Sequence, residues 1–112
     1  MRVITGSARG RRLRTLEGQD VRPTPERVKE AVFSIIQFQI EGRRFLDLFA
    51  GSGQMGIEAL SRGAREAVFV DARKDSLEII RDNLEKTALS PGGRVVGMDA
   101  LAFLSQPNGK FD

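Results

Sequence analysis

The chain has 112 residues, of which 40% are hydrophobic and 29% are charged, so it can form one small domain with an apolar core. The absence of Cys and His excludes disulfides, thiol chemistry, histidine bases and the usual zinc sites, and we expect no bound metal. No apolar run approaches the ~20 residues of a membrane span and no signal-peptide core is present, so we expect a cytoplasmic protein without membrane contact.

Positive charge is concentrated at the N-terminal end of the chain. Residues 1–27 contain seven arginines and three acids, whereas the rest of the chain is nearly balanced. Around a glycine-bounded turn at residues 6–10, we predict a small β-hairpin of residues 2–5 and 11–15 within a basic arm that spans residues 1–21. On or near its tip lie four arginines: Arg9, Arg11, Arg12 and Arg14. The guanidinium group grips phosphate through two hydrogen bonds and stacks on unpaired bases, so the arm indicates RNA binding; a solvated, partly disordered arm is the alternative.

A helix is predicted between residues 26 and 40. Thr24 suits the N-cap position, Pro25 suits the first helical position, and Gly42 ends the segment. The predicted apolar stripe consists of Val28, Ala31, Phe33, Ile35, Ile36 and Ile40. We expect this helix to pack on the core, with Arg22 and Thr24 at its N-terminal end.

From residue 44 onward, apolar strand-like runs alternate with amphipathic helical segments. Strands are predicted at residues 44–50, 66–70, 94–98 and, as a beginning, 110–112, and helices at residues 53–62, 73–87 and 100–104. This order predicts an α/β fold, with a parallel sheet and right-handed crossovers in three layers. Such a sheet binds its ligand at the carboxyl ends of the strands.

A glycine turn connects the first of these strands to the helix that follows it. Glycines let the backbone approach a ligand closely, and the helix N-terminus offers N–H groups. The segment from Gly51 to Gly56 matches G-x-G-x-x-G, and Asp71 lies 20 positions beyond the first glycine, where a ribose-binding acid is found in dinucleotide-binding proteins. An oxidoreductase with a nicotinamide or flavin cofactor is therefore one interpretation.

Three acids lie at three successive strand ends: Asp47, Asp71 and Asp99. A carboxylate at position 47 would repel a pyrophosphate, whereas S-adenosylmethionine carries a positive amino group and a positive sulfonium and no phosphate. Asp71 could then accept hydrogen bonds from both ribose hydroxyls, and Asp99 with the N–H that follows it could read the adenine edge. Helix N-capping is the alternative role for each acid. Together the three acids favour S-adenosylmethionine as the cofactor.

Five segments of the chain resemble one bacterial enzyme family, the 16S ribosomal RNA guanine-N2 methyltransferases of the small-subunit "D" family. They are residues 1–6, 9–13, 22–24 with 27–33, 46–53 and 56–64. The resemblance implies a Rossmann-like class I methyltransferase core, a methyl transfer from S-adenosylmethionine to the exocyclic N2 amine of a guanine, and 16S rRNA of the small ribosomal subunit as the partner. It also implies a monomeric full-length protein.

The resemblance further implies which residues bind the cofactor. The methionine end would be lined by Asp47, Phe49, Ala50, Gly51, Ser52 and Gly53, with Arg22 and Thr24 close by. Asp71 with Ala72 would bind the ribose, and Asp99 with Ala100 the adenine. The four arm arginines would contact rRNA.

One departure from the family pattern concerns catalysis. The family's catalytic loop, an Asn or Asp followed by Pro-Pro and an aromatic residue, comes after the fourth strand, and this chain contains no Pro-Pro pair. We therefore expect no catalytic residue in this chain and interpret residues 22–112 as a partial methyltransferase domain. We expect this chain alone to be inactive and its open sheet edge to favour self-association. A DNA or RNA methyltransferase of adenine or cytosine amines, and a non-catalytic RNA-binding module, are the other interpretations.

Overall fold

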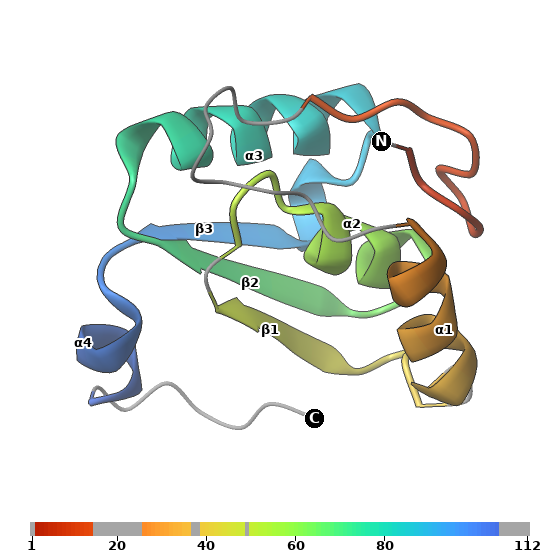
Figure 1. The fold of residues 1–112 in the computed structure, drawn as a ribbon, viewed down its shortest axis with the longest axis horizontal. Helices are drawn as coiled ribbons and strands as arrows, with labels where there is room; N and C mark the ends of the chain where they lie inside the picture. The colour runs from red at the N-terminus through yellow and green to blue at the C-terminus, as the bar shows by residue number, and fades with distance from the viewer. Residues whose placement is uncertain (1, 15–25, 37–38, 49, 106–112) are drawn as a thin grey trace.

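The computed structural model describes residues 2–14, 26–36, 39–48 and 50–105 (Figure 1). Its elements are α1 (Glu26–Ile36), β1 (Arg44–Leu48), α2 (Gln54–Ser61), β2 (Glu66–Asp71), α3 (Lys74–Lys86), a 3-10 turn (Ser90–Gly92), β3 (Gly93–Gly97) and α4 (Ala100–Leu104). The predicted N-cap at Thr24 and the predicted fourth strand lie outside the described residues. Within the described ranges, no helix is long and apolar enough to cross a bilayer.

The three strands form a parallel sheet, as predicted, and their order in the sheet is β1-β2-β3. In the register, Leu48 pairs with Val70 and Asp71 pairs with Gly97, so the carboxyl ends of the strands meet at one edge of the sheet. Because neighbouring strands run parallel, each connection must cross over the sheet, and α2 and α3 make these crossovers.

Helices cover both faces of the sheet, which confirms the three-layer prediction (Figure 1). On the face of α2 and α3, Phe69 packs in one cluster with Ile57 and Ile80. On the opposite face, Val70 packs with Phe103 of α4. These apolar side chains of β2 are fully buried on both faces, which explains why β2 reads as a continuous apolar run.

The predicted apolar stripe of α1 is confirmed only in part, and the helix ends at Ile36 instead of residue 40. Phe33 and Ile40 are buried in one cluster, against which Ile36 packs, whereas Val28 is exposed. Ile35 is 82% exposed, whereas Lys29 and Phe33 are 0% exposed. The inward face of α1 therefore includes a lysine, because a buried carboxylate, that of Glu58, lies opposite it. A charge buried in this way must be paired, and this requirement sets the face of the helix.

Glu58 of α2 is the centre of this buried charged cluster. Its carboxylate accepts hydrogen bonds from the N–H groups of Ile4 (2.8 Å) and Thr5 (3.1 Å) and from Arg62 Nε (2.9 Å), and lies 3.2 Å from Lys29 Nζ. Burial by itself would raise the pKa of the Glu58 carboxyl, but these hydrogen bonds and the lysine charge together hold that pKa below its usual value. The cluster joins the N-terminal arm, α1 and α2.

Within residues 2–14, the predicted hairpin is present as an isolated antiparallel bridge between Arg2 and Arg12, next to a hydrogen bond from the Val3 N–H to the Arg11 carbonyl at 2.9 Å. Three apolar residues of the arm, Val3, Ala8 and Leu13, are buried in the cluster formed with α2 and α3. Residues 2–14 are therefore packed against the domain through these three side chains, while the arginines of this segment are exposed. A glycine is required in the arm at position 6, where φ is +92° and an added Cβ would lie 1.9 Å from a backbone oxygen of α2.

Candidate cofactor site

The glycine turn lies directly after β1 and before α2, at the carboxyl edge of the sheet. Gly51 and Gly53 have φ values of +59° and +82°, which L side chains rarely adopt. The Ala50 N–H donates to the Val70 carbonyl at 3.0 Å, which fixes the turn beside β2. The turn is thus as the sequence predicts, and it holds Ala50, Ser52 and Gly53 in a mostly buried position.

Gly56, the third glycine of the pattern, has a packing role. A Cβ at this position would lie 2.3 Å from Cε1 of Phe69, so no larger residue fits without displacing the ring. The close approach brings the first turn of α2 down onto β2. The Gly56 N–H can therefore reach Asp47 in the neighbouring strand, at 3.1 Å.

Asp47 lies within β1, near its carboxyl end, and its carboxyl is buried, with only 9% of the residue exposed. Its pKa is raised to about 7, mainly by burial and further by the charge of Asp71, while the Gly56 N–H opposes the rise. Among the described residues, no basic side chain pairs with it. A positively charged ligand beside Asp47 would favour the ionised carboxylate, so the two carboxyl groups at the glycine turn fit a cationic ligand.

Asp71 ends β2 and holds the glycine turn. Its Oδ2 accepts the Gly51 N–H at 3.0 Å and its Oδ1 accepts the Arg73 N–H at 2.9 Å. A carboxylate has about four acceptor positions, so each oxygen can accept a further bond from a ribose hydroxyl. Ala72, which follows, is exposed. Ribose binding by Asp71 remains a prediction.

Asp99 follows β3 and caps α4. Its Oδ2 accepts the N–H groups of Leu101 (3.1 Å) and Ala102 (3.2 Å), so the capping role that the sequence left open is confirmed. Ala100, at the first position of α4, is buried. Because β3 pairs with β2, Asp99 lies at the same edge of the sheet as Asp71. Adenine recognition here remains a prediction, and the predicted site residues Arg22, Thr24 and Phe49 lie outside the described residues.

One buried polar residue that the sequence reasoning missed is Asn83 of α3, which is 0% exposed. Its Nδ2 donates to the carbonyls of Ser52 and Arg14, both at 2.9 Å, and its Oδ1 accepts the Arg14 N–H at 2.7 Å. The signal in the sequence is an asparagine between the inward-facing residues Ile80 and Leu84, where an apolar residue would be expected.

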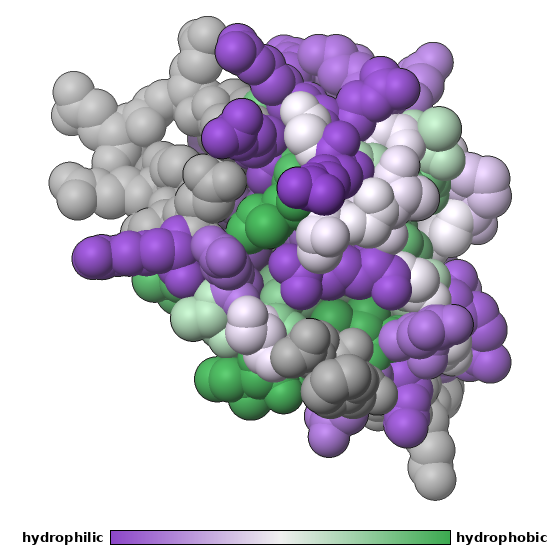
Figure 2. Space-filling model, turned by 90° about the vertical axis from the view of Figure 1, so that its right-hand side faces the viewer, coloured by the Kyte–Doolittle hydropathy of each residue, from purple (hydrophilic) through white to green (hydrophobic). Residues whose placement is uncertain are grey.

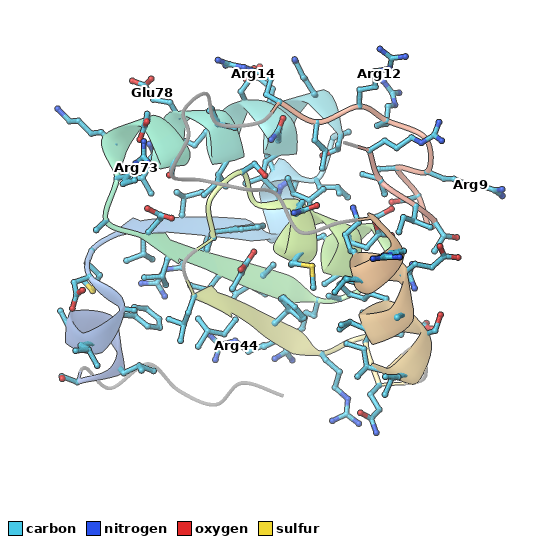
Figure 3. The ribbon with its side chains drawn as sticks, in the orientation of Figure 1. Arg9, Arg12, Arg14, Arg44, Arg73 and Glu78 are labelled. Carbon is cyan, nitrogen blue, oxygen red and sulfur yellow. The ribbon has the colours of Figure 1, made fainter. Side chains whose placement is uncertain are left out.

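The arm presents basic side chains on the face shown in Figure 2, whose upper part is largely hydrophilic. We call Arg9, Arg11 and Arg12 the tip arginines; among the described residues they make no ion pair. Figure 3 shows Arg9 and Arg12 pointing away from the domain. Arg14 differs, because its Nη1 lies 3.2 Å from Oδ2 of Asp82 on α3. A hollow of about 280 Å³, lined in part by Arg2 and Arg9, lies beside the hairpin bridge.

The parallel sheet with its glycine turn and its acids at the strand ends has the class I methyltransferase fold. The solved structure of yhhF from Escherichia coli shares it with a TM-score of 0.84 and 36% identity, over 95% of this chain and 56% of that chain. Within this fold class, the chain belongs to the family described as Conserved hypothetical protein 95, whose model matches residues 1–112.

Curated relatives of this family support the same grouping. YlbH of Bacillus subtilis (strain 168) is 45% identical over 100 residues, which cover 89% of this chain and 54% of the relative. "Ribosomal RNA small subunit methyltransferase D" of Haemophilus influenzae is 39% identical over 108 residues, which cover 96% of this chain and 56% of the relative. The chain thus spans about half the length of the curated relatives it matches.

Proposed function

We propose that this chain provides the cofactor crevice and the RNA-binding arm of an enzyme that methylates RNA of the small ribosomal subunit with S-adenosylmethionine. The observation that supports the proposal most directly is the pair of carboxylates at the glycine turn. Asp47 accepts the Gly56 N–H, Asp71 accepts the Gly51 N–H, and their charges interact. A crevice with two carboxylates favours a cationic nucleoside over a diphosphate.

In this proposal the residues of the chain bind and orient the cofactor. S-adenosylmethionine supplies a methyl group on a positive sulfur that is already activated toward attack, so positioning is the main contribution of the protein. Asp47 pairs with the ammonium group, Asp71 accepts the ribose hydroxyls, and Asp99 with the Ala100 N–H reads the adenine edge. Ser52 and Gly53 let the backbone lie close to the methionine end.

The finer assignment is that the methyl acceptor is the N2 amine of a guanine in 16S rRNA. The name of the Haemophilus influenzae relative and the solvent-facing tip arginines of the arm support RNA of the small subunit as the substrate. The guanine N2 position rests on the family resemblance of the sequence alone. We propose that the groups that orient the target amine lie in parts of the enzyme outside this chain, which has no Pro-Pro pair. Cytoplasmic location and a monomeric whole enzyme belong to the same proposal.

An oxidoreductase with a dinucleotide cofactor is the second candidate. It is favoured by the complete G-x-G-x-x-G pattern and by the packing of Gly56 on Phe69, which is the role of the third glycine in dinucleotide-binding folds. Against it, the carboxyl of Asp47 accepts the N–H of Gly56, in the first turn of the helix whose N-terminus would have to bind a pyrophosphate. We therefore prefer the methyltransferase.

The test is transfer of a labelled methyl group from S-adenosylmethionine to small-subunit rRNA by the whole enzyme, with digestion to nucleosides to identify the product. We expect label in N2-methylguanosine and none with residues 1–112 alone. Label in methylated adenosine or cytidine would replace the guanine assignment, and no transfer by the whole enzyme to RNA or to subunits would refute the proposed activity.

A further inference from the structure

One side chain, Asn83, connects the arm to the glycine turn. Both of its amide hydrogens are used, one on the carbonyl of Ser52 in the turn and one on the carbonyl of Arg14 in the arm. Its amide oxygen accepts the Arg14 N–H at 2.7 Å. The buried amide of Asn83 thus makes hydrogen bonds to both segments. If either segment moves away, the amide is left with unmade hydrogen bonds, which disturbs its remaining bond to the other segment.

The arm is held at this point by two successive residues of α3. Asp82 pairs with the guanidinium of Arg14, and Asn83 with its backbone. The opposite end of the arm is anchored on α2, which begins at the glycine turn: Glu58 accepts two arm N–H groups, and Ser61 Oγ accepts the Ala8 N–H at 2.9 Å. Both anchors of the arm are thus on the helices that flank the turn.

We propose that Asn83 is a positioning residue that couples RNA binding on the arm to cofactor binding at the glycine turn, so that each ligand tightens the binding of the other. The inference rests on the proposed function, because the arm must bind RNA and the turn must bind the cofactor. When the arm is docked, Asn83 is oriented by Arg14 and fixes the Ser52 carbonyl. When the arm separates, the amide loses two of its three hydrogen bonds, and its orientation toward the Ser52 carbonyl is no longer fixed by Arg14.

Positive coupling between the two ligands requires only that both of them favour the docked arrangement of the arm. RNA bound across the tip arginines and the domain stabilises the docked arm, and a cofactor seated on the turn stabilises the conformation that Asn83 supports. Two ligands that favour the same state bind with positive coupling, and the coupling is equal in both directions. Couplings between sites are commonly on the order of 5- to 150-fold in affinity, and for one buried amide we expect about 5- to 10-fold.

The experiment measures the dissociation constant of S-adenosylhomocysteine by calorimetry in wild-type protein, Asn83→Ala and Thr87→Ala. Each protein is measured with and without a saturating concentration of a small-subunit rRNA fragment. Thr87 is the matched control, since it is also buried, at the C-cap of α3. Among the described residues its hydroxyl bonds only to the backbone carbonyls of Asn83 and Leu84, at 2.8 and 3.2 Å, and to neither the arm nor the glycine turn. We expect RNA to tighten S-adenosylhomocysteine about 5- to 10-fold in wild type and Thr87→Ala, and less than about twofold in Asn83→Ala.

A merely structural role for Asn83 predicts a different pattern, in which the substitution weakens both ligands but leaves the factor between them unchanged. That result, or a wild type in which both ligands bind independently, would overturn the inference while leaving the proposed function in place. Failure of wild type to bind S-adenosylhomocysteine or RNA at all would instead remove the proposed function, and the inference with it.

Hydrogen exchange on wild-type protein supplies a second measurement should Asn83→Ala fail to fold. The Arg14 N–H bonds to Asn83, whereas the Arg65 N–H bonds to the Arg43 carbonyl at 2.8 Å, beyond the amino end of β1. We expect saturating S-adenosylhomocysteine to slow exchange at Arg14 more than at Arg65. Equal slowing at both amides would argue against coupling through Asn83.

Discussion

The protonation of Asp47 makes a quantitative prediction about stability. Burial raises the pKa of this carboxyl from 3.8 to about 7. Between these two values the folded state binds a proton that the unfolded state does not, so the free energy of unfolding falls as pH rises through this window. Each pH unit costs about 1.4 kcal/mol, and the whole window amounts to a loss on the order of 4 kcal/mol.

The matching perturbation is Asp47→Asn, which keeps the shape and an oxygen for the Gly56 N–H but cannot ionise. We expect the variant to lack this fall and to be the more stable protein at about pH 8, with equal stability near pH 4. Urea unfolding followed by circular dichroism at several pH values measures the difference. Asp75→Asn is the control. The hydrogen bond from Arg73 lowers the pKa of the exposed Asp75 carboxyl, so this group titrates below the window. Parallel stability curves for wild type and Asp47→Asn between about pH 5 and pH 8 would refute the reasoning.

Three further predictions concern packing, the charged cluster and the arm. Glu58→Gln should lower the free energy of unfolding by about 3–5 kcal/mol in urea titrations, because Lys29 then lies buried without its counter-charge; a loss below about 1 kcal/mol would contradict this. Gly56→Ala should lower the free energy of unfolding by about 1–3 kcal/mol, because the Cβ of the alanine would meet the Phe69 ring. Phe69→Leu in the same chain should recover part of that loss, and no recovery would count against the contact. Replacing the three tip arginines by Gln should reduce the log–log salt slope of RNA binding by about 2–3 in filter binding, and an unchanged slope would exclude them from the interface.

The fold was predictable because its signals are local. The continuous apolar run of β2 indicates a strand buried on both faces, and the glycines at 51, 53 and 56 mark a turn and a close approach that the structure contains. The capping role of Asp99 was likewise visible, since it depends only on the residues that follow it.

What the sequence could not predict depends on contacts between distant segments. Lys29 reads as a solvated charge on α1 until Glu58, 29 positions later in the chain, is placed opposite it. Arm docking is missed for the same reason, because the arm is held by polar groups of α2 and α3 rather than by a long apolar pattern of its own. Asn83 gives a weak signal, because it is an amide at an inward-facing helix position. The residues near it in the sequence, however, do not indicate that its hydrogen-bond partners are Arg14 and Ser52.

With carboxylates at its glycine turn, this site should accept a cationic nucleoside and not a dinucleotide. The most direct test is calorimetric titration of the whole enzyme with S-adenosylmethionine, S-adenosylhomocysteine and NADH, repeated with Asp71→Asn. The account predicts that both sulfur nucleosides bind, that NADH does not, and that the substitution weakens both. NADH binding in the absence of any affinity for S-adenosylmethionine would contradict it.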